Sequence, residues 1–396
     1  MKYAGRLSKV PPYLFVELGK KIAAVRASGA DLIDLGVGDP DLPTPEYVVE
    51  ALSEAARDPS THRYPDYDGE MGFRTAVAEW YGERFGVKLD PRTEVMTLIG
   101  SKEGLAHILW AFVDRGDVAL IPDPAYPVYK AHTLLCGGEP FFMDLTEEND
   151  FLPDLGRIPD EVARRATIMF LNYPSNPTSA VASREFFRDA VAFARRYDIA
   201  LVHDAAYVEM TYDGYVAPSI LEVPGARDVC VEFYSLSKPF NMTGWRIAAA
   251  VGNTDILFKG LGVIKSNTDS GQFNAVQRAA TVALRHNPRA FIAKMNSIYV
   301  ARRDVLVDGL LSAGFRVMKP SGTFYLWVKT PDGLTSTEFA SMLLEKAHVV
   351  VTPGEGYGRS GAGYVRMALT VDEDRLREVV RRISALGAET GPASRA

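Results

Sequence analysis

Lys238 ends the segment "VCVEFYSLSK", whose apolar residues predict a buried strand. Ser235 and Ser237 precede the lysine, a proline follows it, and Arg246 lies where the next apolar run begins. A lysine in this place could form a Schiff base with a carbonyl cofactor, while the hydroxyls and the guanidinium could hold a phosphate. A solvated lysine in a turn has the same local pattern, so the other strand ends must decide between the two interpretations.

Asp204 ends the run "IALVHD" in a similar way. Because that run is apolar, a carboxylate at its tip is expected to be partly buried and to need a cation. The protonated nitrogen of a pyridine ring is such a cation, and pairing with aspartate keeps the ring protonated so that it acts as an electron sink. The alternative is an ordinary turn aspartate or a helix N-cap.

Three further residues could hold such a ring. Asn176 and Tyr207 could donate hydrogen bonds to its phenolic oxygen, and Tyr126 could stack on its face. Each also has an ordinary alternative: an Asn-Pro turn, a tyrosine at the edge of the core, and an aromatic residue in a turn.

The segment "GSK", residues 100–102, lies where a predicted strand passes into a helix. Backbone N–H groups at such a helix start, together with the hydroxyl of Ser101, make an anion site. A plain helix N-cap is the alternative. Ser235, Ser237 and Arg246 would enclose the same phosphate from the other side.

From about residue 93, short apolar runs alternate with amphipathic helical segments. This alternation predicts an α/β fold with a mainly parallel sheet covered by helices. Ligands bind at the carboxyl ends of such strands, and the polar residues named above fall there. The sequence therefore predicts that they form one site.

The pattern changes near residue 290, where a long helix is expected from Pro288 to Gly314. A smaller α+β unit follows, with expected strands "FRVMK", "TFYLWVK", "HVVVTPG" and "GYVRMALT". We therefore expect a large cofactor-binding domain over residues 44–290. Residues 1–43 and 291–396 are expected to form a small domain.

The composition excludes several classes of protein. The 396 residues carry a net charge of −6, which argues against nucleic acid as a partner because phosphate backbones need a basic face. The sequence contains no run of 18 apolar, uncharged residues, so no membrane span is predicted. Cys136 and Cys230 are far apart, which excludes a disulfide framework or a cysteine zinc site, and no other metal site is expected. A cytoplasmic protein is the expectation.

One motif suggests a different kind of site, one that binds a dinucleotide. The segment "GYGRSG", residues 356–361, satisfies the glycine spacing of a dinucleotide-binding loop. The residues after it, "AGYVRMALTV", predict a strand, whereas that loop must open a helix. We therefore reject a dehydrogenase. The absence of H-E-x-x-H and G-x-S-x-G leaves zinc and serine hydrolases without support.

Taken together, the motifs resemble those of the class I/II, aspartate aminotransferase-like family of fold-type I pyridoxal-phosphate enzymes. The resemblance spans residues 35–370 and rests on "LGVGDPDLPTP", "HRYPDYDG", "GSKEGL", "DPAYPVY", "NYPSNPTSA", "HDAAYVEM", "SLSKPFNMTGWRIAAAVG" and "YVRMALT". One departure is Ser179, where the family usually has glycine. We expect it to alter the turn without touching a ligand.

The resemblance implies a role for each matching residue. Lys238 is the Schiff-base lysine and the proton carrier, Asp204 the partner of the ring nitrogen, and Tyr207 a partner of the ring oxygen. The other implied cofactor contacts are made by Ser101, Lys102, Tyr126, Asn176, Ser235, Ser237 and Arg246. Tyr64 resembles the tyrosine that reaches the phosphate of a neighbouring subunit, which implies a homodimer with shared active sites. Arg366 resembles the arginine that grips the substrate's α-carboxylate, with Gly38 and Asn176 beside it.

The substrate is suggested by a finer resemblance. Aspartate-specific relatives bind the side-chain carboxylate with an arginine, but the corresponding segment here, "KSNTDSGQFNAVQ", has Asn267 and no arginine. The chain is most similar to the LL-diaminopimelate aminotransferase branch, which moves an amino group between 2-oxoglutarate and tetrahydrodipicolinate in lysine synthesis. Tyr13, Lys102 and Asn267 could serve the distal carboxylate of that substrate. Asp66 or Asp68 could receive its distal ammonium, unless both belong to a solvated turn.

Three alternatives remain open at this stage. An aspartate, alanine, aromatic or broad-specificity aminotransferase shares most of these motifs. A β-lyase or decarboxylase would keep the cofactor and change the reaction. A regulator that binds the cofactor without catalysis is disfavoured, because Lys238 and Asp204 are both present.

Overall fold

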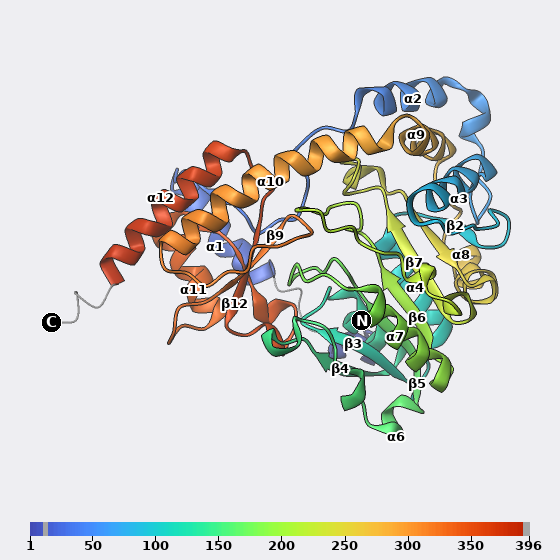
Figure 1. Ribbon diagram of the computed structural model, residues 1–396, viewed down its shortest axis with the longest axis horizontal. Helices are drawn as coiled ribbons and strands as arrows, with labels where there is room; N and C mark the ends of the chain where they lie inside the picture. Colours follow the sequence, from blue (N-terminus) through green and yellow to red (C-terminus); the bar gives the residue numbers. More distant parts are fainter. Residues whose placement is uncertain (11–14, 391–396) are drawn as a thin grey trace.

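The computed structural model describes residues 1–10 and 15–390, so Tyr13 lies outside the described residues. A large body with a central sheet occupies one side of the molecule, and a smaller unit lies against it (Figure 1). Helix α10, Pro288–Ser312, begins beside α9 of the large body and ends against α12 of the smaller unit (Figure 1).

The central sheet has the strand order β2-β8-β7-β6-β5-β3-β4. Neighbours from β7 to β4 run parallel, while β8 is antiparallel to both β2 and β7. The strands span Val95–Leu98 (β2), Val118–Asp123 (β3), Glu139–Asp144 (β4), Ala166–Leu171 (β5), Ala200–Asp204 (β6), Cys230–Ser235 (β7) and Ala248–Gly252 (β8). The expected α/β fold with a mainly parallel sheet is confirmed.

Alternate residues of each inner strand pack into cores on opposite faces of the sheet, because side chains in a strand point to the two faces in turn. In β5, Met169 and Leu171 join the core under α3, α7 and α9. Ile168 and Phe170 join the core under α4 and α5. Burial on both faces explains why these strands are continuous apolar runs in the sequence.

The helices of the large body have the following bounds: α2 Glu46–Arg57, α3 Met71–Phe85, α4 Ser101–Phe112, α5 Val128–Cys136, α6 Asp160–Ala163, α7 Arg184–Tyr197, α8 Gly262–Thr268 and α9 Asn274–Arg285. A π-helical segment, Asp255–Leu261, leads into α8. Within the described residues no helix is long and apolar enough to cross a membrane.

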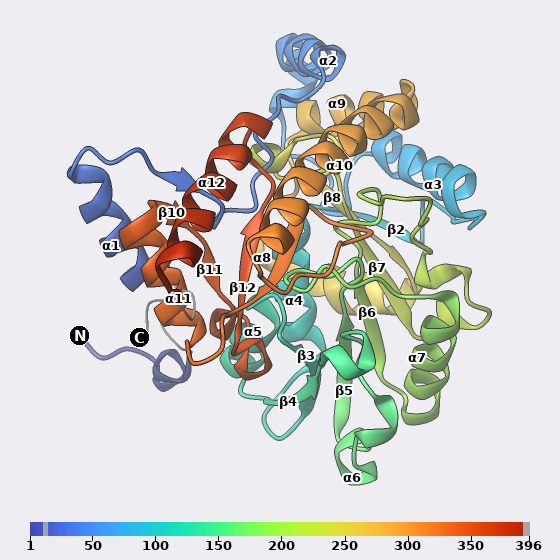
Figure 2. The ribbon, with the colours of Figure 1, turned by 60° about the vertical axis from the view of Figure 1, so that its left-hand side comes forward.

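The smaller unit has its own hydrophobic core. Its antiparallel sheet has the order β11-β12-β9, and β1 pairs with β10 in parallel. Figure 2 shows α1, β10 and α11 gathered at the side of α12. The bounds are α1 Phe15–Ala27, β1 Ile33–Asp34, β9 Tyr325–Lys329, α11 Ser336–Met342, β10 Val349–Val350, β11 Thr352–Pro353, β12 Tyr364–Ala368 and α12 Glu373–Thr390.

Two expected strands of the smaller unit differ in the structure. "FRVMK" contributes only an isolated bridge from Val317 to Val328, so it is not a strand. "HVVVTPG" divides into β10 and β11, because its two halves pair with different strands, β1 and β12. The segment "GYGRSG" lies in two short 3₁₀ turns and leads into strand β12. A dinucleotide-binding loop would lead into a helix instead, so this motif is not one.

The two expected domain boundaries lie just before α2 and within α10. The boundary between residues 43 and 44 lies before α2. There Asn241 Nδ2 donates to the Pro43 carbonyl over 3.1 Å, and the Thr44 hydroxyl donates to the Asn241 carbonyl over 2.8 Å. The boundary between residues 290 and 291 lies in the first turn of α10. The division at these positions stays a prediction.

Candidate active site

Lys238 follows the carboxyl end of β7. Its Nζ donates to the Gly38 carbonyl over 2.8 Å and lies 5.4 Å from the ring centre of Phe324. Burial lowers the pKa of Lys238 to about 8, against the opposing charge of Asp39. A larger share of the amine is therefore unprotonated near neutral pH than in an exposed lysine, which is what a nucleophilic lysine requires.

Asp204 ends β6, and its side chain is buried. The Tyr129 hydroxyl donates to Asp204 Oδ2 over 2.7 Å, whereas Asp204 Oδ1 is buried with no hydrogen-bond partner. Burial raises the pKa of Asp204 to about 6, and the Tyr129 hydrogen bond opposes this rise. A buried carboxylate oxygen without a donor is suited to receive an N–H group from a bound ligand.

Tyr129, in the first turn of α5, is a residue that the sequence analysis missed. Its ring stacks on Phe170 at 4.6 Å, which fixes the hydroxyl beneath Asp204. The Tyr126 ring meets the Tyr129 ring edge-on at 6.0 Å. Tyr129 follows Tyr126 by three residues in "DPAYPVY", but Tyr126 lies before α5, so helical spacing alone did not indicate that Tyr129 reaches Asp204.

Gly100 and Ser101 form the corner between β2 and α4. Gly100 has φ +75°, and a Cβ added there would lie 2.1 Å from the Arg246 guanidinium. The Ser101 hydroxyl is buried with no hydrogen-bond partner. The start of α4 and the Arg246 guanidinium thus meet around a polar corner, as an anion site requires.

Three other residues of the expected phosphate site lie at the end of β7, just beyond it, and on α4. The Ser237 backbone N–H donates to the Ser235 hydroxyl over 3.2 Å, and both serines are buried. Lys102 is exposed, and its Nζ lies 5.8 Å from the ring centre of Tyr126.

Arg366, on β12, is buried in a polar and aromatic cradle. Its guanidinium donates to the Asn176 side-chain oxygen over 2.8 Å and to the Gly36 carbonyl over 2.7 Å. It also lies over the rings of Tyr325 and Tyr357, at 4.1 and 5.0 Å from their centres. An arginine held from several sides is preorganised for a carboxylate.

Asn172 and Tyr325, which the sequence analysis also missed, connect the parts of this site. Asn172 Nδ2 donates to the Asp204 carbonyl over 2.7 Å, and its oxygen accepts from the Asn176 backbone N–H over 2.8 Å. The hydroxyls of Tyr325 and Tyr207 form a 3.1 Å hydrogen bond.

Tyr325 also explains the glycine at position 38. A Cβ on Gly38 would lie 1.8 Å from the Tyr325 hydroxyl oxygen, so a larger residue cannot be placed there without moving the ring. Burial raises the pKa of Tyr207 well above its usual range, which keeps its hydroxyl protonated and able to donate.

Ser179 adopts φ +60°, a conformation that favours glycine. Its hydroxyl bonds to the Thr323 hydroxyl over 2.8 Å and donates to the Tyr325 carbonyl over 2.7 Å. These bonds offset the backbone strain and fasten the loop that carries Asn176 to β9 of the smaller unit.

The remaining expected residues make other contacts in this chain. Tyr64 is 88% exposed. Asn267, exposed on α8, donates to the Val263 carbonyl of its own helix over 2.8 Å. Asp68 forms an ion pair with the buried Arg74, and Asp66 is exposed. The roles expected for these residues, like those of the other site residues, stay predictions.

Comparison with known proteins places this site in a family. The family described as "Aminotransferase class I and II" matches residues 30–383. LL-diaminopimelate aminotransferase from Moorella thermoacetica is 54% identical over 383 residues, 97% of this chain and 98% of its own. LL-diaminopimelate aminotransferase from Syntrophobacter fumaroxidans is 55% identical over the same shares. The substrate-bound structure of BacF from Bacillus subtilis superposes with a TM-score of 0.93 at 39% identity and covers 98% of both chains.

The chain therefore belongs to the class I and II aminotransferase family, and it is a pyridoxal-phosphate-dependent transaminase whose substrates are small molecules, amino acids and oxo acids. The residues present fit this cofactor. Asp204 Oδ1 is buried without a partner and could accept the ring N–H, and the buried Ser101 hydroxyl could donate to the phosphate. The lowered pKa of Lys238 suits a lysine that forms a Schiff base.

Proposed function

We propose that this enzyme transfers an amino group between LL-diaminopimelate and 2-oxoglutarate, which would place it in lysine biosynthesis. The observation that supports this substrate is the 54–55% identity, over nearly the whole chain, to the two LL-diaminopimelate aminotransferases. We also propose a cytoplasmic location, because Cys136 and Cys230 are both free thiols, as a reducing compartment favours. Cell fractionation with an antibody against the protein would test the location.

When bound, pyridoxal phosphate supplies a reactive carbonyl and a ring that withdraws electrons from the substrate's α-carbon. Lys238 Nζ would act as the general base that removes the proton from that α-carbon. Asp204 would hold the proton of the ring nitrogen through its unpartnered oxygen. The Tyr207 hydroxyl and the Asn176 side chain would orient the ring oxygen.

Arg366 is proposed to bind the α-carboxylate that the amino acid and the oxo acid share. Its fixed position beside Asn176 supports this role, because the two side chains are joined by a 2.8 Å hydrogen bond. The far end of LL-diaminopimelate carries a second carboxylate and a second ammonium. For these groups we propose Tyr13, Lys102 and Asn267 on one side, and Asp66 or Asp68 on the other. Asp66 is the more available carboxylate, because Asp68 already pairs with Arg74.

We further propose a homodimer with shared active sites. Tyr64 supports this arrangement, because a tyrosine side chain that is 88% exposed in one chain is available to a neighbouring subunit. Sedimentation equilibrium is expected to give about twice the 43.5 kDa mass of the chain. A Tyr64→Phe variant is expected to bind the cofactor about 10- to 100-fold more weakly, since a hydrogen bond to a charged phosphate contributes roughly 1.5–3 kcal/mol. A fully active monomer would exclude this arrangement.

The substrate assignment predicts strong discrimination against short amino donors. LL-diaminopimelate should be preferred over aspartate and alanine by at least about 100-fold in kcat/KM, because a site that pairs two distal charges leaves its groups unpaired with a shorter substrate. The measurement is a panel of amino donors at constant 2-oxoglutarate. Comparable kcat/KM for aspartate or alanine, with none for LL-diaminopimelate, would overturn the substrate and leave the transaminase class unchanged. Release of ammonia or carbon dioxide as the main product would indicate a lyase or decarboxylase instead.

A further inference from the structure

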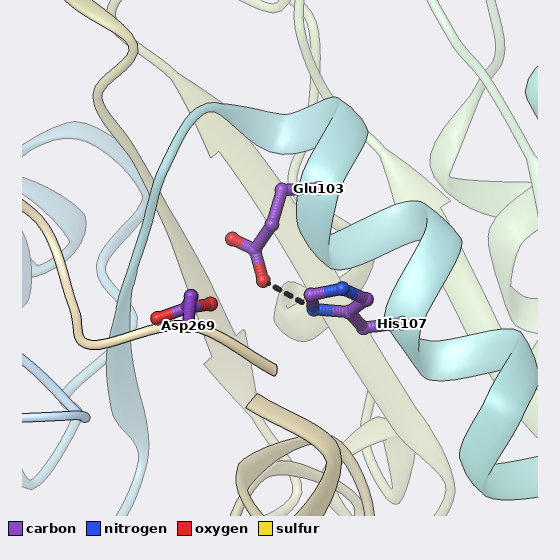
Figure 3. A group of neighbouring side chains, drawn as sticks. All are labelled: Glu103, His107 and Asp269. Atoms are coloured by element: carbon purple, nitrogen blue, oxygen red, sulfur yellow. Dashed lines mark hydrogen bonds and ion pairs between the residues drawn. The ribbon is translucent and has the colours of Figure 1, made fainter. Parts of the chain in front are cut away.

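A cluster of largely buried polar side chains lies between α4 and the end of α8. Glu103, His107 and Asp269 converge there with ligand atoms within 4.8 Å of one another (Figure 3). The side chain of Lys265, on α8, is 1% exposed and donates to both carboxylate oxygens of Asp269 over 3.0 Å. Its Nζ also lies 3.6 Å from Glu103 Oε2.

The three residues drawn in Figure 3 have the side-chain types of a metal site, but Lys265 already supplies the cation. A divalent ion would have to displace an ammonium group that both carboxylates hold. His107 Nδ1 lies 2.7 Å from the other oxygen of Glu103, so this carboxylate is engaged on both sides. The positive charge of Lys265 therefore balances the carboxylates of the cluster. The contacts of these carboxylates with the surrounding backbone indicate which segments the cluster positions.

One side of the cluster supports the start of α4. Glu103 Oε2 accepts from the Ile99 backbone N–H over 3.0 Å, directly before the Gly100–Ser101 corner. The carboxylate thus fixes the backbone that presents the Ser101 hydroxyl.

The other side supports Arg246. Asp269 Oδ1 accepts from the Gly271 N–H over 2.7 Å, and the next residue, Gln272, donates to the Arg246 carbonyl over 2.6 Å. Arg246 has φ +56°, so its backbone needs such a partner to stay in place. Lys265 joins the two supports, because it contacts both Glu103 and Asp269.

We propose that Lys265 is a positioning residue for the cofactor phosphate, because its buried ammonium holds the Ser101 and Arg246 halves of the phosphate site together. The residue touches neither the cofactor nor the substrate in this proposal. The inference rests on the proposed phosphate site and is independent of which amino acid is the substrate.

The test compares pyridoxal phosphate with pyridoxal, which lacks the phosphate, in binding to the apoenzyme. Lys265→Met is expected to weaken pyridoxal phosphate by about 10- to 100-fold, while the dissociation constant of pyridoxal changes less than about threefold. Lys259→Met is the matched control, because Lys259 pairs with Asp255 at 2.9 Å on an exposed turn of the neighbouring π-helical segment. The control should change neither constant.

A second variant separates positioning from loss of stability. Lys265→Met leaves two carboxylates without their cation, whereas Lys265→Met/Asp269→Asn removes one charge of each sign. The double variant is expected to melt near the wild-type temperature and still to lose its preference for the phosphorylated ligand. Equal weakening of both ligands, or an unchanged preference, would overturn the proposal.

Two further results would each contradict a different part of the proposal. Stoichiometric binding of Zn²⁺ or Mn²⁺ to the wild-type holoenzyme by titration calorimetry, lost in Glu103→Gln, would make the cluster a metal site and overturn the role of Lys265. A wild-type apoenzyme that binds pyridoxal as tightly as pyridoxal phosphate would instead refute the phosphate site itself.

Discussion

Replacing Lys238 by alanine is expected to lower turnover by at least about 10²- to 10⁴-fold, the range that loss of a positioned general base produces. The reason is that Lys238 Nζ is both the nucleophile toward the cofactor and the proposed carrier of the substrate's α-proton. The variant should also lose the visible absorbance of the bound cofactor. Single-turnover kinetics and borohydride reduction followed by peptide mass spectrometry measure both effects.

Lys238→Arg is the control for this prediction. Arginine keeps a positive charge near the Gly38 carbonyl, but its guanidinium stays protonated and cannot act as a nucleophile. The arginine variant should therefore be as inactive as the alanine variant. A coloured, active Lys238→Ala enzyme whose reduced adduct maps to another lysine would refute the assignment.

Replacing Asp204 by asparagine is expected to lower kcat by about 10- to 100-fold, because a neutral amide cannot hold the ring-nitrogen proton and a hydrogen bond to a charged group contributes roughly 1.5–3 kcal/mol. Tyr129→Phe is the matched control. It keeps the carboxylate and removes only the 2.7 Å hydrogen bond to Oδ2, so its loss should be nearer tenfold. An asparagine variant with wild-type kcat would show that another group protonates the ring.

The same substitution should stabilise the apoenzyme. Burial raises the pKa of Asp204 to about 6 from its usual 3.8, so the folded chain binds this proton more tightly than the unfolded chain does. The stability that the group contributes is fully present below about pH 4 and is lost as the pH rises through about 6. Above that pH the ionised carboxylate costs about 3 kcal/mol, which the asparagine variant avoids.

Urea unfolding of the two apoenzymes measures this effect. Apo Asp204→Asn should be the more stable protein at pH 8, and the difference should shrink as the pH falls toward 4. A wild-type apoenzyme that is more stable than the variant at pH 8 would contradict the pKa shift. Gain of stability with loss of turnover is expected where a catalytic carboxylate is held in an apolar place.

The positions of several candidate residues could be predicted from local pattern alone. Lys238, Asp204 and Ser101 each follow an apolar run in the sequence, and each lies at the end of a strand of the central sheet. The carboxyl ends of parallel strands lie at one edge of a sheet, so the sequence pattern alone predicts that these residues lie at the same edge. Arg366 was found by resemblance, since nothing in its local sequence requires it to approach Asn176.

Tyr129, Asn172 and Tyr325 could not be predicted in this way. Their contacts depend on how α5 lies against β6, how β5 pairs with β6, and how β9 approaches the loop after β6. A buried aromatic residue at helical spacing looks the same in sequence whether or not its hydroxyl reaches a carboxylate. The cluster around Lys265 was missed for the same reason, because Glu103 and Asp269 are 166 positions apart in the numbering.

The sequence by itself determined the α/β fold, because periodicity is a property of the chain, and the resemblance of its motifs to a known family indicated the kind of cofactor. The tertiary structure decided which strands "HVVVTPG" joins, that "FRVMK" forms no strand, and which oxygen of Asp204 is left for a ligand. These outcomes depend on pairing and burial between segments that are distant in the chain. Local residue preferences do not contain that information.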